Sequence, residues 1–327
     1  MTHDITRRTA LKTLGVGLGT LGVVGGTASA HAGPHTLFTY DPTAGEFPEN
    51  IAIDRRGRKY VSFTPLGEIR TISPDNQTQS TLATFDTGTG IGVIGVEVTP
   101  KGTLYACLIT LNSAGSDTHG IWQIPRGEDP SLFAALDPET LPNDILLDGH
   151  SLLVTDSIGG AVLRVSEGSV SEWVSDPLLE GTGAVGFGFP IGANGIARGS
   201  DGTVYVANTE KGHIVAIPTN PDGSAGTPEL FVADERLFAS DGIAIDVHDN
   251  VYVGVIGQNT VVKVGHDRRI ETLATAADGL DNPSDVTFGT SRGEQKTLFI
   301  TNFALLSMQS PSLMTLDVGT PGRPIHP

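Results

Sequence analysis

Four oxygen-bearing side chains recur at matching points of this sequence and could together hold a metal ion. Each stands at the start of a short apolar run: Glu49 in ENIAID, Asn143 in NDILLD, Asn194 in NGIARG and Asp241 in DGIAID. Two carboxylates held close together would repel each other and lose solvation unless a cation lies between them. Oxygen ligands without histidine or cysteine favour a hard cation, and Ca²⁺ tolerates irregular geometry best, with Mg²⁺ or Mn²⁺ as alternatives.

A simpler interpretation of these residues is that Asn and Asp precede strands merely to form turns. Their side chains can hydrogen-bond to their own backbone in such positions. For any single position this explanation would suffice. Four residues of this kind at equivalent points of the pattern favour the ion.

The four positions belong to a repeat that runs through the chain. The equivalent point also falls at Ile94 and Ser284, so six segments follow one another at intervals of 43 to 51 residues. A unit of this length that holds four short strands is typical of a propeller blade. We therefore predict an all-β fold, a six-bladed β-propeller with four antiparallel strands per blade. A seventh blade would need about 40 to 50 more residues, and a β-sandwich would not repeat its anchor residue six times.

The two ends of the chain are expected to close the ring. The sixth segment lacks a fourth strand, whereas HTLFTYD at residues 35–41 precedes the first anchor without a partner. We predict that this segment pairs with residues 312–318, because such pairing removes an exposed sheet edge. The first strand of every blade then enters from the same face, so the six anchors form a ring at the mouth of the central channel.

The N-terminus carries the features of an export signal. Arg7 and Arg8 precede a glycine-rich apolar stretch that ends in Ala28-Ser29-Ala30, which predicts a twin-arginine signal over residues 1–30 and an extracellular or cell-envelope location. A short membrane anchor is the alternative, but glycine interrupts the apolar stretch repeatedly. Residues 31–327 are expected to form one propeller domain with an ordered core at about 35–318.

Composition limits the partners. The formal net charge of −17 argues against nucleic acid or anionic lipid. The lone cysteine, Cys107, excludes a disulfide within the chain and suits a small core side chain. We expect a monomer that binds a small-molecule substrate and has no membrane contact beyond export.

Two further features are candidates for the site. His119 lies in a loop rich in Gly, Ser and Asp, where it could act as a general acid or base or simply be a solvated loop histidine. The long connection at residues 176–192 leads into Asn194 and could form a lid, with Phe187 and Phe189 as an apolar wall. Packing over the fourth blade is the alternative for this loop.

The chain resembles the six-bladed propellers of regucalcin (senescence marker protein), gluconolactonase and diisopropylfluorophosphatase, and more remotely the paraoxonases. The resemblance covers residues 35–318 and depends on FPENIAID, LPNDILLD, ANGIARGSDGTVYVAN and SDGIAID. It implies a catalytic divalent cation, usually calcium, held by Glu49, Asn143, Asn194 and Asp241. In some members one of the asparagines contacts substrate more than metal, which here would be Asn143. The histidine pair of paraoxonases has no clear match.

Two functions follow from these observations. One is an exported metal-dependent hydrolase of the gluconolactonase type, in which the ion polarises the carbonyl of a lactone or related ester. In that enzyme Asp241 would accept a proton from the attacking water or attack directly, and Asn143 would orient the substrate. The alternative is a non-catalytic extracellular propeller that serves as a binding scaffold.

Overall fold

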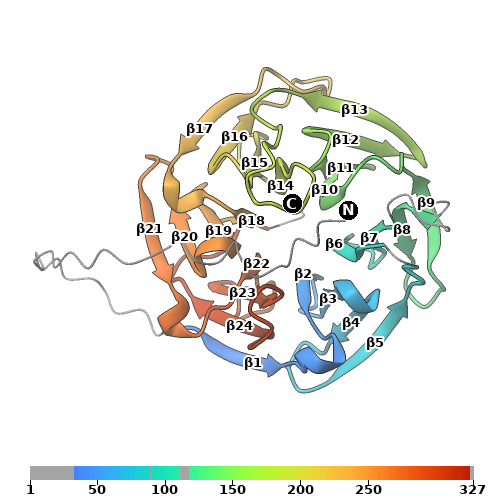
Figure 1. Ribbon diagram of the computed structural model, residues 1–327, viewed down its shortest axis with the longest axis vertical. Coiled ribbons are helices and arrows are strands. Elements are labelled where there is room, and N and C mark those ends of the chain that lie inside the picture. Colours follow the sequence, from blue (N-terminus) through green and yellow to red (C-terminus); the bar gives the residue numbers. More distant parts are fainter. Residues whose placement is uncertain (1–32, 89, 111–117, 325–327) are drawn as a thin grey trace, which may run out of the picture. The chain divides into compact units, whose positions relative to one another are not determined.

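A computed structural model describes residues 33–88, 90–110 and 118–324, and the predicted export signal at residues 1–30 lies outside them. The described residues form six four-stranded antiparallel sheets arranged around a central axis (Figure 1). The predicted six-bladed β-propeller is therefore confirmed. Within the described ranges, no helix has the length and apolar character needed to cross a membrane.

The strands of blades one to three run outward from the axis in chain order. Blade one comprises β2 (Pro48–Ile53), β3 (Lys59–Phe63), β4 (Glu68–Ile72) and β5 (Gln79–Thr84). Blade two comprises β6 (Gly92–Val98), β7 (Leu104–Ile109), β8 (Gly120–Ile124) and β9 (Ser131–Ala135). Blade three comprises β10 (Pro142–Asp148), β11 (Ser151–Asp156), β12 (Ala161–Ser166) and β13 (Ser169–Ser175).

Blades four and five follow the same order, and blade six takes its outermost strand from the N-terminus. Blade four comprises β14 (Ala193–Arg198), β15 (Val204–Asn208), β16 (His213–Ile217) and β17 (Glu229–Ala233). Blade five comprises β18 (Ser240–Ile245), β19 (Val251–Val255), β20 (Thr260–Val264) and β21 (Ile270–Ala274). Blade six comprises β22 (Pro283–Phe288), β23 (Thr297–Asn302), β24 (Ser312–Asp317) and β1 (His35–Thr39). Short 3₁₀ turns connect some strands: η1 (Pro42–Ala44), η2 (Thr64–Leu66), η4 (Glu235–Leu237), η5 (Ile256–Gln258) and η6 (Ala276–Asp278).

The ring is closed by the two ends of the chain, as predicted. Strand β1 pairs antiparallel with β24, and His35 lies opposite Thr315 and Thr39 opposite Ser312. In Figure 1 the blue β1 lies beside the red β24. The last blade thus has its fourth strand, and β24 presents no open edge.

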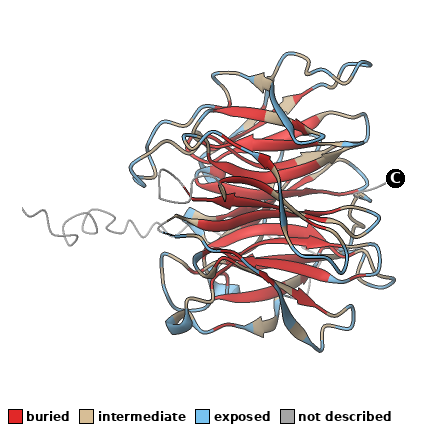
Figure 2. Cartoon of the chain, turned by 90° about the vertical axis from the view of Figure 1, so that its right-hand side faces the viewer, coloured by how far each residue is buried: buried red, intermediate tan, exposed pale blue. Residues whose placement is uncertain are grey.

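The hydrophobic core is divided among the junctions between blades. Six of its clusters each combine side chains from two neighbouring blades, as where Phe85 of blade one meets Trp122 of blade two edge-on with ring centroids 5.2 Å apart. Figure 2 shows the buried strands in the middle of the molecule and the exposed residues in the turns and outer strands. Cys107 is fully buried in the cluster between blades two and three, as expected of a core side chain.

Every inner strand carries a register shift at its anchor. In β2 the pairing with β3 jumps from Pro48 to Ile51, and the other five inner strands shift at the same point. The anchors therefore lie inside the strands and not ahead of them, which corrects the expectation from sequence. A bulge breaks the alternation of faces. Two rings of residues result: the anchor ring (Glu49, Ile94, Asn143, Asn194, Asp241, Ser284) and the second ring formed by the residues that follow (Asn50, Gly95, Asp144, Gly195, Gly242, Asp285).

Polar side chains of the second ring connect three of the six blade junctions. Each accepts a hydrogen bond from a backbone N–H of the next blade at 3.0 Å: Asn50 Oδ1 from Val96, Asp144 Oδ2 from Ile196, and Asp285 Oδ2 from Ile51. These bonds satisfy N–H groups that the register shift leaves unpaired in the sheet.

Glycines of the second ring occupy the other three junctions, where the inner strands approach each other closely. A Cβ on Gly95 would lie 2.1 Å from the Asn143 carbonyl oxygen, and one on Gly242 would lie 2.0 Å from Asp285 Oδ1. On Gly195 it would lie 2.4 Å from the Asp241 carbonyl oxygen. Only glycine fits these contacts, so acceptor side chains and glycines together close the ring around the channel.

Candidate functional site

The four predicted ligands all lie in the anchor ring and are nearly buried. Glu49, Asn143, Asn194 and Asp241 are each exposed by 8% or less. The Asn143 amide nitrogen donates to Ser157 Oγ at 3.2 Å, and that of Asn194 donates to Thr209 Oγ1 at 3.0 Å. Both amides are thereby held by their nitrogens, which leaves their oxygens to face other partners.

Two buried oxygens of this ring have no hydrogen-bond partner. They are Glu49 Oε2 and Asn194 Oδ1. An unpartnered buried acceptor is costly, and buried polar atoms in folded proteins nearly always have a partner. Two such acceptors on one ring are suited to serve as ligands of a hard cation.

Both carboxyl groups of the anchor ring have a pKa above the usual range. Burial, followed by repulsion from Asp241, Asp285 and Asp144, raises the pKa of Glu49 well above its usual range. Burial and the charge of Asp144 raise the pKa of Asp241 to about 8, although a hydrogen bond from Asn194 opposes the shift. A divalent cation would remove both penalties, because it stabilises the ionised carboxylates.

The donor set fits an oxygen-binding ion. Among residues 33–88, 90–110 and 118–324, no three His, Cys, Asp or Glu side chains are grouped so as to bind a metal. A site in the anchor ring would therefore need the amide oxygens of Asn143 and Asn194 beside the two carboxylates. Such mixed carboxylate and carbonyl oxygens, completed by water, are typical of calcium.

The remaining anchors do not extend this ligand set. Ser284 Oγ donates to the backbone carbonyl of Glu49 at 2.5 Å, so it holds the strand that carries Glu49. Ile94 offers no polar atom. The anchor ring is therefore apolar on the side of blade two, where Ile94 is the anchor.

His119, the predicted acid–base candidate, is not a solvated loop side chain, and its ring nitrogens contact residues outside the anchor ring. Its side chain is completely buried just before β8. The backbone N–H of Thr110 donates to Nδ1 at 3.2 Å, and Nε2 lies 3.3 Å from Thr140 Oγ1. Burial also lowers the pKa of this imidazole. His119 therefore connects backbone segments in the interior, although its sequence environment suggests a loop.

Ser157 and Thr209 hold two of the predicted ligands, although neither was predicted as a ligand itself. Each directly follows the second strand of its blade, and each accepts the amide hydrogen of the neighbouring asparagine. Ser157 Oγ also donates to the Ala193 carbonyl at 2.6 Å, which connects blade three to blade four. The sequence signal was present, since a small hydroxyl residue follows VTD and VAN at equivalent points.

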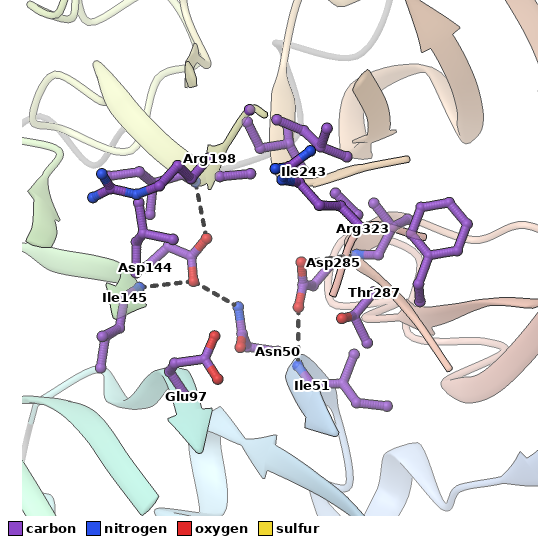
Figure 3. A pocket seen from close by; sticks show the side chains of 18 of the residues that line it. Asn50, Ile51, Glu97, Asp144, Ile145, Arg198, Ile243, Asp285, Thr287 and Arg323 are labelled. Carbon is purple, nitrogen blue, oxygen red and sulfur yellow. Dashed lines mark hydrogen bonds between the residues drawn. The ribbon is translucent and has the colours of Figure 1, made fainter. Parts of the chain in front are cut away.

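A separate cavity lies farther along the inner strands. It has a volume of about 460 Å³, and none of the four predicted ligands lines it. Figure 3 shows Asn50, Asp144 and Asp285 of the second ring at this cavity together with Glu97. Arg323 lines it too, and its backbone N–H donates to the Ile245 carbonyl at 2.8 Å. Because the second-ring carboxylates are occupied by backbone N–H groups, we assign them to blade junctions and not to chemistry.

Glu97 lines this cavity and is expected to make the free energy of unfolding depend on pH. Burial raises its pKa to about 8, against a hydrogen bond from the Val98 N–H that lowers it. The folded protein therefore retains a proton that the unfolded chain loses near pH 4.5, so stability falls as pH rises through this window. We expect Glu97→Gln to raise the free energy of unfolding by up to about 5 kcal/mol above pH 8, with little effect at pH 4.5. Urea unfolding in excess calcium at both pH values measures this, and equal effects at the two would contradict it.

Comparison with known proteins places these features in a family. Residues 67–304 match the family described as SMP-30/Gluconolactonase/LRE-like region. A putative gluconolactonase structure has a TM-score of 0.66 at 16% identity, and the alignment covers 89% of this chain and 94% of that one. The calcium-binding protein regucalcin from Agrobacterium tumefaciens has a TM-score of 0.65 at 17% identity, with coverage of 90% and 96%.

A gluconolactonase from Xanthomonas campestris has a TM-score of 0.62 at 18% identity, with 89% of each chain covered. No curated protein sequence shows a significant match. At these identities the solved structures establish the shared fold, whereas the family match covers most of the chain. The chain therefore belongs to the SMP-30/gluconolactonase/LRE-like family of β-propellers.

Proposed function

We propose that this protein is a metal-dependent hydrolase that opens a lactone or a related ester at the anchor ring. One observation carries the proposal: Glu49 Oε2 and Asn194 Oδ1 are buried without a partner on the ring that also holds Asp241. Membership of a family that includes gluconolactonases supports the reaction class. The calcium-binding regucalcin neighbour supports the choice of ion.

The residues of the ring have distinct roles in this proposal. Glu49, Asn143, Asn194 and Asp241 would hold the ion, and Ser157 and Thr209 fix the two amides. When bound, such an ion polarises a carbonyl and stabilises negative charge on its oxygen. Asn143, whose amide nitrogen is held by Ser157, would also orient the substrate.

Asp241 is the base of the reaction. Its carboxylate removes a proton from water as the water oxygen bonds to the carbonyl carbon. The ester C–O bond then breaks, and the proton passes to the departing alkoxide, so that the product is a hydroxy acid. Near-complete burial of Asp241 keeps bulk water away from the carboxylate and strengthens its interactions.

Calcium removal is the direct test of the proposal. We expect the mature protein to bind about one calcium ion per chain and to hydrolyse δ-gluconolactone or γ-butyrolactone, with activity lost in chelator and restored by calcium. An ion present at a hundred times its dissociation constant should also stabilise the fold by about 2.7 kcal/mol. Calorimetry, pH-stat assays and thermal unfolding measure these quantities. Calcium binding without any hydrolysis of lactones or aryl esters would instead favour the scaffold function.

We also propose that the protein acts outside the cytoplasmic membrane. The support is the arginine pair at Arg7 and Arg8, the glycine-rich stretch after it, and the Ala28-Ser29-Ala30 sequence. The intact mass of the protein recovered from the producing cells decides this point. A mass that corresponds to cleavage after Ala30 supports export, and a retained N-terminus argues against it.

A further inference from the structure

The apolar side of the anchor ring continues into a cluster of apolar side chains. Ile94 packs with Leu141 and Ile109, and three partly buried side chains join them: Ile91, Ile158 and Phe189. We call Ile91, Ile94, Leu141, Ile158 and Phe189 the apolar wall. Ile94 is the member of the anchor ring in blade two, between Glu49 of blade one and Asn143 of blade three. The wall therefore adjoins the oxygen ligands.

Two residues of the apolar wall are close in sequence to Asn143 and to Ser157, which holds the Asn143 amide. Ile158 follows Ser157, whose Oγ accepts the Asn143 amide, and Leu141 lies two residues before Asn143. The backbone N–H of Gly192 donates to the Ser157 carbonyl at 2.8 Å, which brings the end of the 176–192 loop to the same place. Phe189 thus packs over blades two and three, whereas residues 178–185 of the same loop are held by Asn208 and Glu210 of blade four.

The loop that carries Phe189 is held firmly at its base. The Glu210 carboxylate accepts backbone hydrogen bonds from Thr182, Gly183 and Val185. Burial opposes the ionisation of Glu210, but these N–H groups outweigh it and lower its pKa. Asn208 also donates to the carbonyls of Leu178 and Glu180, at 3.0 Å each. The loop base is therefore fixed before any ligand arrives.

The tip of this loop carries an aromatic side chain that is not buried in the core. Gly183, Gly186 and Gly188 all have positive φ angles, a backbone path that favours glycine. Between the last two glycines Phe187 is 49% exposed, whereas Phe189 belongs to the apolar wall and packs on its buried members. Partly buried apolar side chains such as Ile158 and Phe189, next to a buried polar ring, resemble the lining of a ligand site, where apolar surface surrounds a few polar groups.

From this arrangement we infer that the substrate of the proposed hydrolase carries an apolar substituent, which lies on the apolar wall while its carbonyl meets the anchor ring. This inference rests on the proposed function. A sugar lactone would place hydroxyl groups against Ile94, Ile158 and Phe189, whose side chains offer no hydrogen bonds in return for lost water. An alkyl or aryl substituent on the lactone ring would instead gain from removing apolar surface from water.

A series of γ-lactones with side chains of zero to six carbons tests the inference. We expect kcat/KM to rise about fourfold per added methylene, mainly through KM, until the wall is covered. The hexyl lactone should exceed δ-gluconolactone by at least about a hundredfold, the ratio expected if only three or four of its methylenes cover the wall. Phe189→Ala should reduce kcat/KM for the hexyl lactone about tenfold more than for the unsubstituted lactone. Phe189→Leu should keep most of the chain-length dependence, because it retains apolar surface.

Controls separate this inference from the proposed function. Leu230→Ala, an exposed position on the outer strand β17, should leave the series unchanged. Binding of the matching γ-lactams to the calcium-loaded protein gives a readout without hydrolysis, and their affinity should rise with chain length. Lactone hydrolysis with no dependence on chain length overturns the inference and leaves the function standing. Absence of hydrolysis with lactam binding that increases with chain length rejects the function and retains the apolar subsite. Ile158→Ser is the second variant if Phe189→Ala fails to fold.

Discussion

Replacing Asp241 with asparagine is expected to lower kcat/KM for lactone hydrolysis by about a thousandfold and to stabilise the metal-free protein. The first effect follows from loss of both a charged ligand and the base. The second follows because Asp241 is 7% exposed and its pKa is raised to about 8 by burial and by Asp144. Asparagine keeps the shape but has no charge to bury. Glu49→Gln should likewise lower kcat/KM and stabilise the metal-free protein, because burial and repulsion from Asp241 raise the pKa of Glu49.

The effect of Asp241→Asn on stability should depend on pH. A carboxyl whose folded-state pKa is raised costs stability as pH rises from its unfolded value through the folded one. In chelator the stability gain of Asp241→Asn should therefore be small near pH 4 and largest above pH 8. In calcium the wild type should instead be more stable than Asp241→Asn, because only the wild type is stabilised by the ion. Asp267→Asn, whose wild-type side chain is 61% exposed, is the matched control and should change neither quantity. Full activity in Asp241→Asn would remove Asp241 from the mechanism.

Replacing Asp285 with alanine is expected to reduce the free energy of unfolding by about 2 to 5 kcal/mol. Its carboxylate accepts from the N–H of Ile51 at 3.0 Å and from that of Val286 at 2.8 Å. Alanine would leave both buried donors without an acceptor, at the junction where blade six meets blade one. The charge of Asp285 is itself unfavourable, since burial and Asp144 raise its pKa well above the usual range. We expect the loss of two acceptors to outweigh that relief.

Asparagine at position 285 separates the two contributions. It keeps one acceptor oxygen and carries no charge, so its stability should lie between those of alanine and wild type. Asn50 already performs the equivalent role between blades one and two, where its Oδ1 accepts from Val96 at 3.0 Å. Chemical unfolding in excess calcium provides the values and keeps the anchor ring in one state. An alanine variant as stable as the wild type would show that these N–H groups find other partners.

The propeller was predictable because its signal is repeated six times. Anchors such as Asn194 and Asp241 recur ahead of similar apolar runs, and the unpaired HTLFTYD segment requires a partner. Hydrophobic patterning identifies strands from neighbouring residues alone, and repetition removes the ambiguity of each one. Strand β1 therefore pairs with β24 as expected.

The second ring was not predicted because it depends on a register shift. Strand alternation places Glu49 and Asn50 on opposite faces, so only one of them should face the channel. The bulge in every inner strand changes this, and a bulge depends on pairing with the neighbouring strand and not on local sequence alone. The burial of His119 was missed for a related reason: its loop composition indicates exposure, whereas in the fold it is buried and contacts Thr110 and Thr140.

The pairing of β1 with β24 has a consequence for biosynthesis. Residues that meet there, such as His35 and Thr315, are separated by 280 positions. A ribosome makes β1 among the first strands and β24 last, so the circle cannot be completed before nearly the whole polypeptide has emerged. Contacts between residues this far apart in sequence form slowly, so closure is expected to be a late step of folding. A nascent chain that terminates early remains an unclosed arc, in which the first-made strand has nothing to pair with.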